Sequence, residues 1–373
     1  MCADRLRVGV VGTGLIAQVM HLPYLAELDD LFEIRAVCDA SRKAAEACAA
    51  RYGATSVYTD WRYLVEEDLD AVLVLTSGSH APIAGAAAES GRSVFVEKPL
   101  CYSVAEGKEL INTVRRTGVT VMVGYPKRYD PAFIELCHRV SAMGDLRFVQ
   151  LTTMESPVAP YVGHYRINSR DDIGQDQIAD WQTDRANRVK SAIGDVGDLY
   201  SRTYEVVLID SLVHELNLLR GVLGEPDELK FASIREASVN VLLDFNGVEC
   251  ALTWIDLPGI ARYEMEVRFY DPNERLRLAF PSPFLRSVPT VLDSEKGEVG
   301  TPHASVAREI FSYEEPFKLE LVAFHRAVTE GAEAPTSGID GLHDIALCQS
   351  IIKGGIESRP VLQPSDLNAA STE

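Results

Sequence analysis

Residues 6–17 read Leu-Arg-Val-Gly-Val-Val-Gly-Thr-Gly-Leu-Ile-Ala. The apolar run over the first six residues predicts a buried strand, and the stretch from Leu15 to Leu28 predicts a helix directly after it. Between them stands Gly12-Thr-Gly14-Leu-Ile-Ala17, in which the first glycine permits a tight turn, the second lets a pyrophosphate approach the backbone, and the small Ala17 lets helix and strand pack closely. Amides at the helix N-terminus would face the phosphates. The stretch therefore predicts a dinucleotide-binding turn.

An acidic residue stands at the distance that this motif requires. A second strand is predicted over Glu33–Cys38, and Asp39 ends it, about 20 residues beyond Ala17, as expected of a carboxylate that binds a ribose 2′-hydroxyl. Its charge repels a 2′-phosphate and favours NAD. Ser41-Arg42-Lys43 follow directly, however, and offer hydroxyl and cationic groups that suit a phosphate, so NADP stays open as the alternative.

The pattern of the first third of the chain continues this unit. Buried strands are predicted over 70–75, 93–96 and 119–123, and helices over 42–52, 81–89 and 104–116, an alternation that is typical of a parallel sheet. After Gly124 the pattern changes, because a helix over 131–143 precedes strands over 146–154, 239–245, 249–255 and 264–270 without helices between them. We therefore predict a Rossmann domain over 1–124 and a mainly antiparallel α+β domain over 125–373, whose C-terminal segment packs back on the first.

Two stretches give weaker patterns. Residues 157–203 are polar and of mixed charge, and Ser169-Arg-Asp-Asp172 resembles a capping box before a helix through Ile178 and Trp181. An exposed surface helix is favoured there over one that covers a substrate. Residues 281–301 contain three prolines and predict a loop.

Composition excludes several classes of protein. The 373 residues hold 36 Lys+Arg against 55 Asp+Glu, and a net charge of −19 opposes binding to nucleic acid and to anionic membranes. No apolar run approaches the ~18 residues of a membrane helix, and no signal peptide is recognisable, so we expect a soluble cytoplasmic protein. The seven scattered cysteines form no C-x-x-C pair, which predicts reduced, mostly buried thiols and neither a disulfide framework nor a metal site.

Chemistry is expected where Glu97-Lys98-Pro99 ends a predicted strand, because ligands of open α/β sheets meet the carboxyl ends of the strands. A lysine there can stabilise charge on a substrate oxygen. Further along, Asp210 and His214 stand four residues apart, so on a helix they share one face. Histidine exchanges protons near neutral pH, as oxidation of a secondary alcohol requires.

At this point the sequence resembles the Gfo/Idh/MocA oxidoreductase family. The resemblance covers nearly the whole chain and rests on the glycine fingerprint and on the following segments: His80-Ala-Pro82, the 91–100 stretch around Glu97-Lys98-Pro99, Val123-Gly-Tyr-Pro-Lys-Arg-Tyr-Asp-Pro131, Asp210-Ser-Leu-Val-His214-Glu-Leu-Asn217, Leu223-Gly-Glu-Pro226, and the 317–331 and 336–360 segments. It implies a Rossmann domain and a second domain with an open, largely antiparallel sheet, with the active site between them. It also implies a homo-oligomer, a dimer or a tetramer, formed through that sheet.

The resemblance assigns roles to individual residues. Lys98, Asp210 and His214 are the expected catalytic residues, acting on a secondary hydroxyl or ketone of a sugar, amino sugar, sugar nucleotide or cyclitol. The expected cofactor-binding residues are Gly12, Gly14, Leu15, Ile16, Asp39, Ser41, Arg42, Thr76, His80, Glu97 and Lys98, with NAD as cofactor. Substrate contacts are expected from Tyr125, Lys127, Arg128 and Asn217.

The chain departs from the family pattern around the substrate. The usual glycine-rich lead-in to the aspartate is replaced by Thr203-Tyr-Glu-Val-Val-Leu208, Leu212 replaces a glycine, Asn217 a common aspartate, and Pro126 a frequent asparagine. Two alternatives therefore stay open, a catalytically silent dinucleotide-binding regulator and a reductase of a non-sugar carbonyl or C=C bond. The net charge and the acids of 157–203 also suggest a cationic ring substrate, such as an amino sugar.

Overall fold

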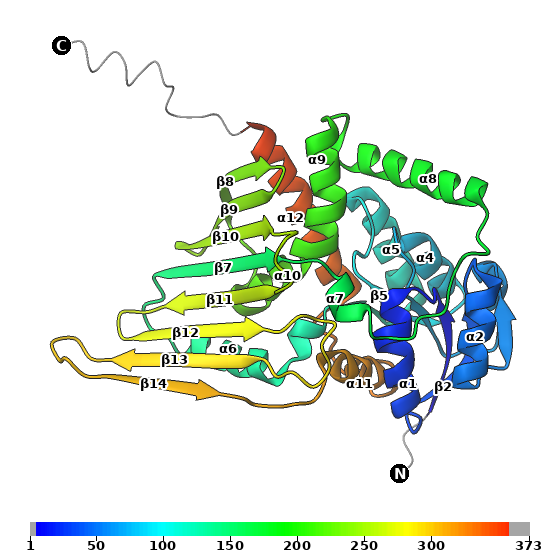
Figure 1. The fold of residues 1–373 in the computed structure, drawn as a ribbon, viewed down its shortest axis with the longest axis horizontal. Coiled ribbons are helices and arrows are strands. Elements are labelled where there is room, and N and C mark those ends of the chain that lie inside the picture. Colours follow the sequence, from blue (N-terminus) through cyan, green and yellow to red (C-terminus); the bar gives the residue numbers. More distant parts are fainter. Residues whose placement is uncertain (1–4, 358–373) are drawn as a thin grey trace.

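A six-stranded parallel sheet forms the N-terminal part of the computed structural model, which describes residues 5–357. The strand order is β3-β2-β1-β4-β5-β6, and every pairing is parallel. The order reverses beside β1, so the carboxyl ends of β1 and β4 diverge into the crevice in which such sheets bind ligands. The predicted Rossmann fold is confirmed (Figure 1). The strands are β1 Leu6–Val11, β2 Phe32–Cys38, β3 Ser56–Tyr58, β4 Ala71–Val74, β5 Ser93–Glu97 and β6 Val121–Gly124.

Helices connect these strands, and local sequence sets their ends. Ser41 caps α2 by accepting a hydrogen bond from the amide of Ala44, and Gly53 ends that helix in the left-handed conformation. The predicted helix after the glycine turn is present but irregular, since Ala17–His21 is π-helical before α1 begins. The helices are α1 Leu22–Glu27, α2 Arg42–Tyr52, α3 Trp61–Leu64, α4 Ala81–Glu89 and α5 Val104–Thr117.

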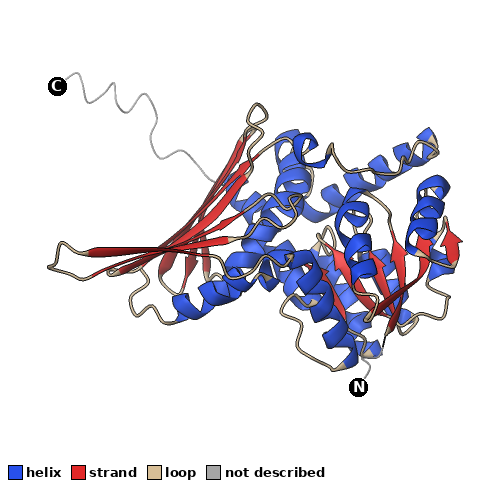
Figure 2. Cartoon of the chain, turned by 60° about the horizontal axis from the view of Figure 1, so that its bottom comes forward, coloured by secondary structure: helices blue, strands red, loops and turns tan. Residues whose placement is uncertain are grey.

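The second part of the chain is built on an eight-stranded sheet of order β14-β13-β12-β11-β7-β10-β9-β8. All neighbours are antiparallel except β7 and β10, which are parallel, so the mainly antiparallel prediction is confirmed. Helices α6 Pro131–Ser141, α10 Val213–Leu223 and α12 Gly338–Glu357 lie on one face, and no helix of the described chain covers the other (Figure 2). The strands are β7 Phe148–Glu155, β8 Glu228–Arg235, β9 Ser238–Phe245, β10 Val248–Asp256, β11 Glu264–Tyr270, β12 Glu274–Phe280, β13 Val291–Gly297 and β14 Ala304–Glu309.

Two local predictions were wrong. The 281–301 stretch is not all loop, because β13 runs through it and pairs with β12 and β14, while the prolines lie in the loop before it. The predicted capping box at Ser169 is absent: α8 Gln175–Ile193 begins at Gly174, and Asp172 instead accepts hydrogen bonds from the distant α2. The predicted helix itself is confirmed.

The C-terminal segment returns to the parallel sheet after β14. Helix α11 Pro316–Thr329 packs against α1 and β6, and the backbone of Thr336 accepts a 2.7 Å hydrogen bond from Val123 in β6. The hydroxyl of Thr336 also donates to the Val123 carbonyl. The predicted domain division at residue 124 coincides with the end of β6 and stays a prediction. Residues 358–360 of the 336–360 segment lie outside the described residues.

A long insertion between β7 and α10 leaves the large sheet and crosses to the parallel one (Figure 1). It contains α7 Ala159–Val162, an irregular strap over residues 163–174, α8, and α9 Asp198–Arg202. Only Val189 of α8 is buried, in agreement with the polar sequence. Within residues 5–357 no helix is long and apolar enough to cross a membrane, and the six cysteines described there are unpaired.

Candidate active site

The glycine turn after β1 has the shape that a dinucleotide requires. Gly12 has φ +97°, and a Cβ placed on it would lie 2.7 Å from the backbone of Leu75 and Thr76 at the end of β4. Only glycine fits this position without displacing the neighbouring strand. At Gly14 an added Cβ would meet only the guanidinium of Arg170, at 3.6 Å. Leu15 and Ile16 are half-buried in the first turn of the helix and pack on the core. The residues present therefore fit the predicted cofactor.

Asp39 ends β2 as predicted, and its carboxylate has four donors around it. Oδ2 accepts from the amide of Thr13 at 2.7 Å and from its hydroxyl at 3.0 Å, and Oδ1 accepts from the amide of Ser41 at 2.8 Å. Arg170 of the strap lies 3.3 Å from Oδ1. Because a carboxylate offers about four acceptor positions, a ribose hydroxyl that binds here has to replace one donor, and Arg170 is the exposed one.

The residues after Asp39 also contact the strap. The hydroxyl of Ser41 donates to Asp172, and the backbone amide of Lys43 donates to the same carboxylate at 3.0 Å. Arg42 points to solvent and lies 3.4 Å from Glu46 on its own helix. Two acids of the insertion, Asp171 and Asp172, thus lie against the start of α2 at the predicted cofactor site, while Asp184 and Asp195 pair with Arg188 and Lys190 of α8.

Two further strand ends complete the crevice. Thr76 follows β4, and its carbonyl lies 2.7 Å from Nε2 of His80, whose Nδ1 lies 2.6 Å from the carbonyl of Pro99. His80 is fully buried, so it joins these two loops and does not itself face the crevice. Glu97 at the end of β5 is bound by Nε2 of His21 at 2.6 Å. Burial opposes the ionisation of Glu97, but the hydrogen bond and charge of His21 outweigh it, and the pKa of Glu97 is lowered.

Lys98 and Asp210 meet at the centre of the molecule. Nζ of Lys98 donates to the backbone carbonyl and to Oδ1 of Asp210, both at 2.6 Å. Asp210 lies in a π-helical segment, Thr203–Leu212, that leads directly into α10. This segment is formed by the residues that replace the glycine-rich lead-in of the family, and π-helical turns are frequent at functional sites. The Asp210 side chain is 65% exposed, so the ion pair faces the cleft.

His214 follows in α10 and is held beside these groups. Its ring stacks edge-on against Tyr125, with centroids 5.8 Å apart, and Nδ1 is buried without a hydrogen-bond partner among the described residues. Burial lowers the pKa of His214 well below its usual value, and the charges of Lys127 and Lys98 lower it further. The imidazole is therefore neutral at pH 7 and can accept a proton.

The structure separates the four predicted substrate residues into two groups. Lys127 lies near His214 and within 3.4 Å of Glu215, and the fully buried Tyr125 packs against His214, so both adjoin that histidine. Arg128 and Asn217 do not: Arg128 donates to the backbone and side-chain oxygens of Asn217, both at 3.1 Å. Asn217 is fully buried and donates to Asp340 and Asp344 of α12. Their role is to join α10 to its neighbours.

Sequence reasoning missed a group of polar residues on the large-sheet side of the cleft. Nε1 of Trp254 donates to the hydroxyl of Ser211 at 3.2 Å, and Ser211 donates to Glu155 at 3.1 Å. Burial raises the pKa of Glu155. Desolvation raises the pKa of the half-buried Tyr263, and the nearby charges of Glu215 and Glu155 raise that pKa further. Ser211 stands next to Asp210 in the chain, which was an available signal, but nothing local marks the β7 and β10 residues.

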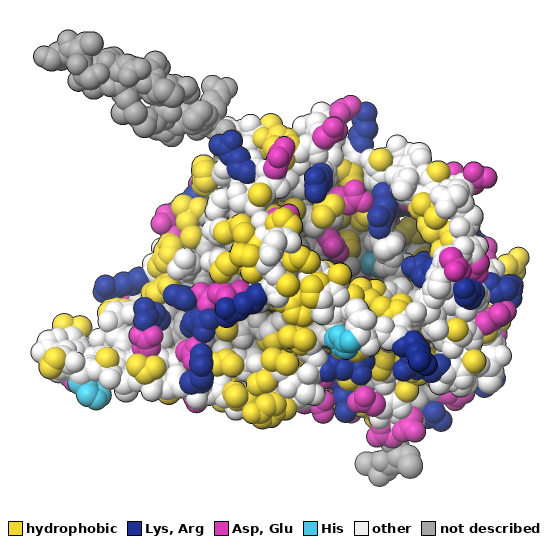
Figure 3. All heavy atoms as spheres, in the orientation of Figure 1, with side chains coloured by type: hydrophobic (Ala, Val, Ile, Leu, Met, Phe, Trp, Pro, Cys, Tyr) yellow, Lys and Arg dark blue, Asp and Glu magenta, His cyan; other side chains and the backbone are white. Residues whose placement is uncertain are grey.

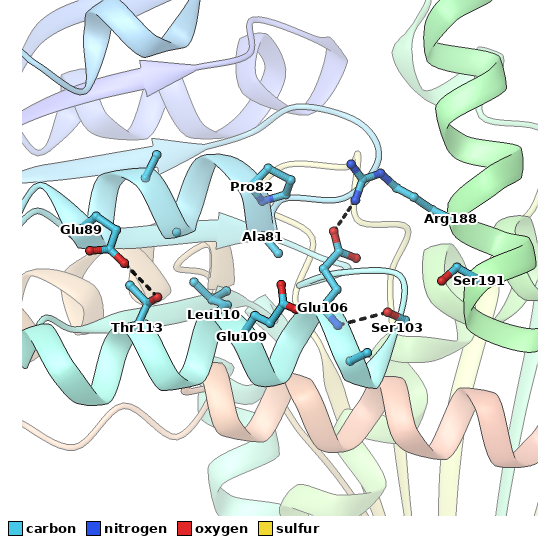
Figure 4. Close-up of a pocket in the computed structure, with 13 residues that line it drawn as sticks. Ala81, Pro82, Glu89, Ser103, Glu106, Glu109, Leu110, Thr113, Arg188 and Ser191 are labelled. Carbon is cyan, nitrogen blue, oxygen red and sulfur yellow. Dashed lines mark hydrogen bonds and ion pairs between the residues drawn. The ribbon is translucent and has the colours of Figure 1, made fainter.

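A separate cavity of about 600 Å³ lies between α4, α5 and α8, away from Lys98 (Figure 4). Small residues of α4 line one side, and Arg188 of α8 reaches across to Glu106 of α5. Glu106 also accepts from the hydroxyl of Ser79 at 2.6 Å and from the amide of Tyr102 at 3.0 Å. This contact anchors α8 to the parallel sheet.

The strap and α8 together cover the dinucleotide crevice, and the surface is hollowed beneath α8 (Figure 3).

Comparisons with known proteins agree with this geometry. The model of the Gfo/Idh/MocA oxidoreductase family, NAD-binding Rossmann fold, matches residues 6–125. An inositol 2-dehydrogenase of Rhizobium meliloti is 26% identical over 369 residues, which cover 95% of this chain and 98% of that protein. A myo-inositol 2-dehydrogenase of Thermotoga maritima is 22% identical over 372 residues, with 95% and 98% covered.

Solved structures share the whole fold. A 3-ketoreductase from Actinomadura kijaniata, in complex with NADP and TDP-benzene, superposes with a TM-score of 0.71 at 22% identity, covering 94% of this chain and 98% of that one. UDP-N-acetylglucosamine 3-dehydrogenase from Acidithiobacillus ferrooxidans gives 0.70 at 18% identity, covering 94% and 97%. The glycine turn, the acid after β2 and the Glu97-Lys98-Pro99 strand end all lie within residues 6–125, so this part of the chain matches the NAD-binding Rossmann fold of the Gfo/Idh/MocA oxidoreductases, and nearly the whole chain is similar to inositol dehydrogenases.

Proposed function

We propose that the protein interconverts a secondary hydroxyl and a ketone on a sugar or cyclitol ring. The observation that carries this proposal is the grouping of Lys98, Asp210 and a neutral His214 at the carboxyl end of β5, beside the dinucleotide crevice. The named relatives support the substrate class, since they are inositol dehydrogenases and sugar ketoreductases. When bound, the nicotinamide accepts the hydride in oxidation and supplies it in reduction.

The chain's own groups handle the proton and the oxygen. In oxidation the neutral imidazole of His214 accepts the hydroxyl proton as the C–H hydride departs, and in reduction the protonated imidazole returns it. The ammonium of Lys98, held by Asp210 at 2.6 Å, donates a hydrogen bond to the substrate oxygen and stabilises the charge that develops on it. A positioned acid or base is worth about 10²–10⁴ in rate.

The substrate ring would lie between these groups and the large sheet. Glu155, Ser211 and Trp254 offer acceptors and donors of the kind that ring hydroxyls use. The cleft contains Lys98 and Lys127 as well as the carboxylates of Asp210, Glu155 and Glu215, so neither sign of charge dominates. This balance favours a neutral polyol over a cationic ring.

The test is absorbance at the reduced-nicotinamide band with a panel of cyclitols, sugars, amino sugars and sugar nucleotides. We expect turnover of a neutral ring by the wild type, and a loss of about 10²–10⁴ in kcat for both Lys98→Met and His214→Ala. Matched controls are Lys108→Met and His138→Ala, which remove the same residue types from exposed positions. Hydride transfer that persists in both active-site variants would disprove the assignment, and tight cofactor binding without turnover would favour a regulator.

A further inference from the structure

A carboxylate of the strap, that of Asp172, binds the start of α2. Asp172 of the strap accepts one hydrogen bond from the hydroxyl of Ser41 and another, of 3.0 Å, from the backbone amide of Lys43. Its neighbour Asp171 binds Nζ of Lys43 at 3.0 and 3.2 Å. Ser41 and Lys43 stand about 130 residues before these acids, so the contact joins the insertion to the cofactor-binding sheet.

Asp39, two residues before Ser41, indicates which part of a bound dinucleotide would lie here. A ribose 2′-hydroxyl binds the acid at the end of β2, so a phosphate on that hydroxyl must lie beyond it, over the residues that begin α2. The groups available to such a phosphate are the Ser41 hydroxyl, the Lys43 amide and the cations of Arg42 and Lys43. Two of these donors are the ones that Asp172 already binds.

We propose that Asp172 occupies the 2′-phosphate position of the dinucleotide site and thereby makes the protein selective for NAD over NADP. A phosphate entering here has to displace the carboxylate from Ser41 and Lys43. It also has to approach Asp39 and Asp171, whose charges repel it. NAD carries only a hydroxyl at this carbon and leaves the contact intact.

The strap is fixed at several points, so Asp172 is held in place by more than its own hydrogen bonds. The amide of Asn168 donates to the side chain of Gln18 at 2.7 Å, beside the glycine turn, and the hydroxyl of Tyr165 donates to the carbonyl of Phe284 at 2.9 Å. The Lys43 amide and the Ser41 hydroxyl also lower the pKa of Asp172, which keeps the carboxylate ionised at neutral pH. The carboxylate that opposes a phosphate on the ribose 2′-oxygen is therefore held in place by the folded chain.

The experiment measures dissociation constants of NADH and NADPH by ligand fluorescence, on the full-length protein without substrate. We expect the wild type to bind NADH at least about tenfold more tightly than NADPH. In Asp172→Ala the ratio should fall about tenfold through tighter NADPH binding, a change equivalent to one hydrogen bond with a charged partner. Asp180→Ala, which removes an exposed acid of α8, is the matched control and should leave the ratio unchanged.

A double variant identifies the donors. Asp172→Ala/Lys43→Ala should lose part of the gained NADPH affinity and keep that for NADH, because the freed site then has Arg42 as a cation but no longer Lys43. Melting temperatures verify that the variants fold. Asp172→Asn, which keeps the shape of the side chain, should also lower the preference for NADH over NADPH, but by less than Asp172→Ala. Wild-type protein that prefers NADPH, or an unchanged ratio in both Asp172 variants, would overturn the proposal. Because binding is measured without substrate, failure of the proposed ring oxidation would leave this result standing.

Discussion

Replacing Asn217 with aspartate tests whether this residue supports the fold or binds substrate. The side chain is fully buried, and its amide donates to Asp340 at 2.6 Å and to Asp344 at 2.7 Å while its oxygen accepts from Arg128. In Asn217→Asp both donors become acceptors, and a third carboxylate stands against two others. Aspartate is nevertheless the residue that the family resemblance would have favoured.

The expected loss follows from the contacts. Each hydrogen bond to a charged group contributes about 1.5–3 kcal/mol, so losing two should lower the free energy of unfolding by about 3–5 kcal/mol. For a chain of this size that corresponds to a melting temperature lower by about 4–6 °C. Urea titration followed by circular dichroism measures the change, and the urea midpoint should fall while KM of the refolded fraction stays constant.

A compensating variant separates hydrogen bonding from general damage. In Asn217→Asp/Asp344→Asn the donor and acceptor exchange places, and Arg220 keeps its contacts to Asp340 and Glu225, so more than half of the stability should return. An unchanged urea midpoint in the single variant, together with a raised KM, would refute the structural assignment and restore Asn217 as a substrate residue.

Three further outcomes are expected. Gly12→Ala should lower the free energy of unfolding by about 3 kcal/mol and abolish dinucleotide binding, because φ is +97° and the new methyl group would lie 2.7 Å from the backbone that follows β4. Gly85→Ala, whose new methyl group would have no neighbouring atom within 4 Å, should not lower stability in the same urea titration. Burial and the charge of Glu97 raise the pKa of Glu320, whose carboxylate has no hydrogen-bond partner among the described residues, well above normal. Wild-type stability should therefore fall as pH rises through that pKa, and Glu320→Gln should have a higher urea midpoint than wild type at pH 8 but not at pH 5. An equal difference at both pH values would contradict this. Since burial and Lys127 hold the pKa of His214 low, kcat/KM for oxidation should stay constant down to below pH 6.5, and Lys127→Met should move its acid limb to higher pH.

The sequence predicted those parts of the molecule whose cause is local. Residues 6–17 contain strand, turn and helix within one short stretch, so their pattern alone specifies the first βα unit and places Asp39. The predicted helices over 42–52 and 104–116 also have local causes, because Ser41 and Ser103 cap α2 and α5 by accepting a hydrogen bond from an amide three residues on. Lys98 directly follows β5, whose strand pattern is local as well, while its role stays a prediction.

The parts that were missed depend on contacts between distant residues. Ser169-Arg-Asp-Asp172 has the composition of a helix cap, but Asp172 finds better donors at Ser41 and Lys43, which no local window contains. The family resemblance implies that Asn217 contacts substrate, but its side chain is bound by two carboxylates of α12, more than 120 residues later, which no local pattern indicates. In both cases tertiary partners decide between two uses that the local pattern allows.

Lys98, the lysine that we propose to be catalytic, is positioned by departures from regular helix geometry that no periodicity rule anticipates. Glu97 is bound by His21 from the π-helical segment Ala17–His21, and Lys98 by Asp210 from the π-helical segment Thr203–Leu212. In a regular helix each residue turns by about 100°, so an extra residue per turn changes which side chain faces the strand end. The four-residue spacing of Asp210 and His214 is therefore not the reason that both reach the cleft, since a π-helical turn ends between them. The geometry follows from a helix that widens just before His214, and the wider turns are formed by Thr203–Leu212, which includes the residues at the place of the expected glycine-rich lead-in.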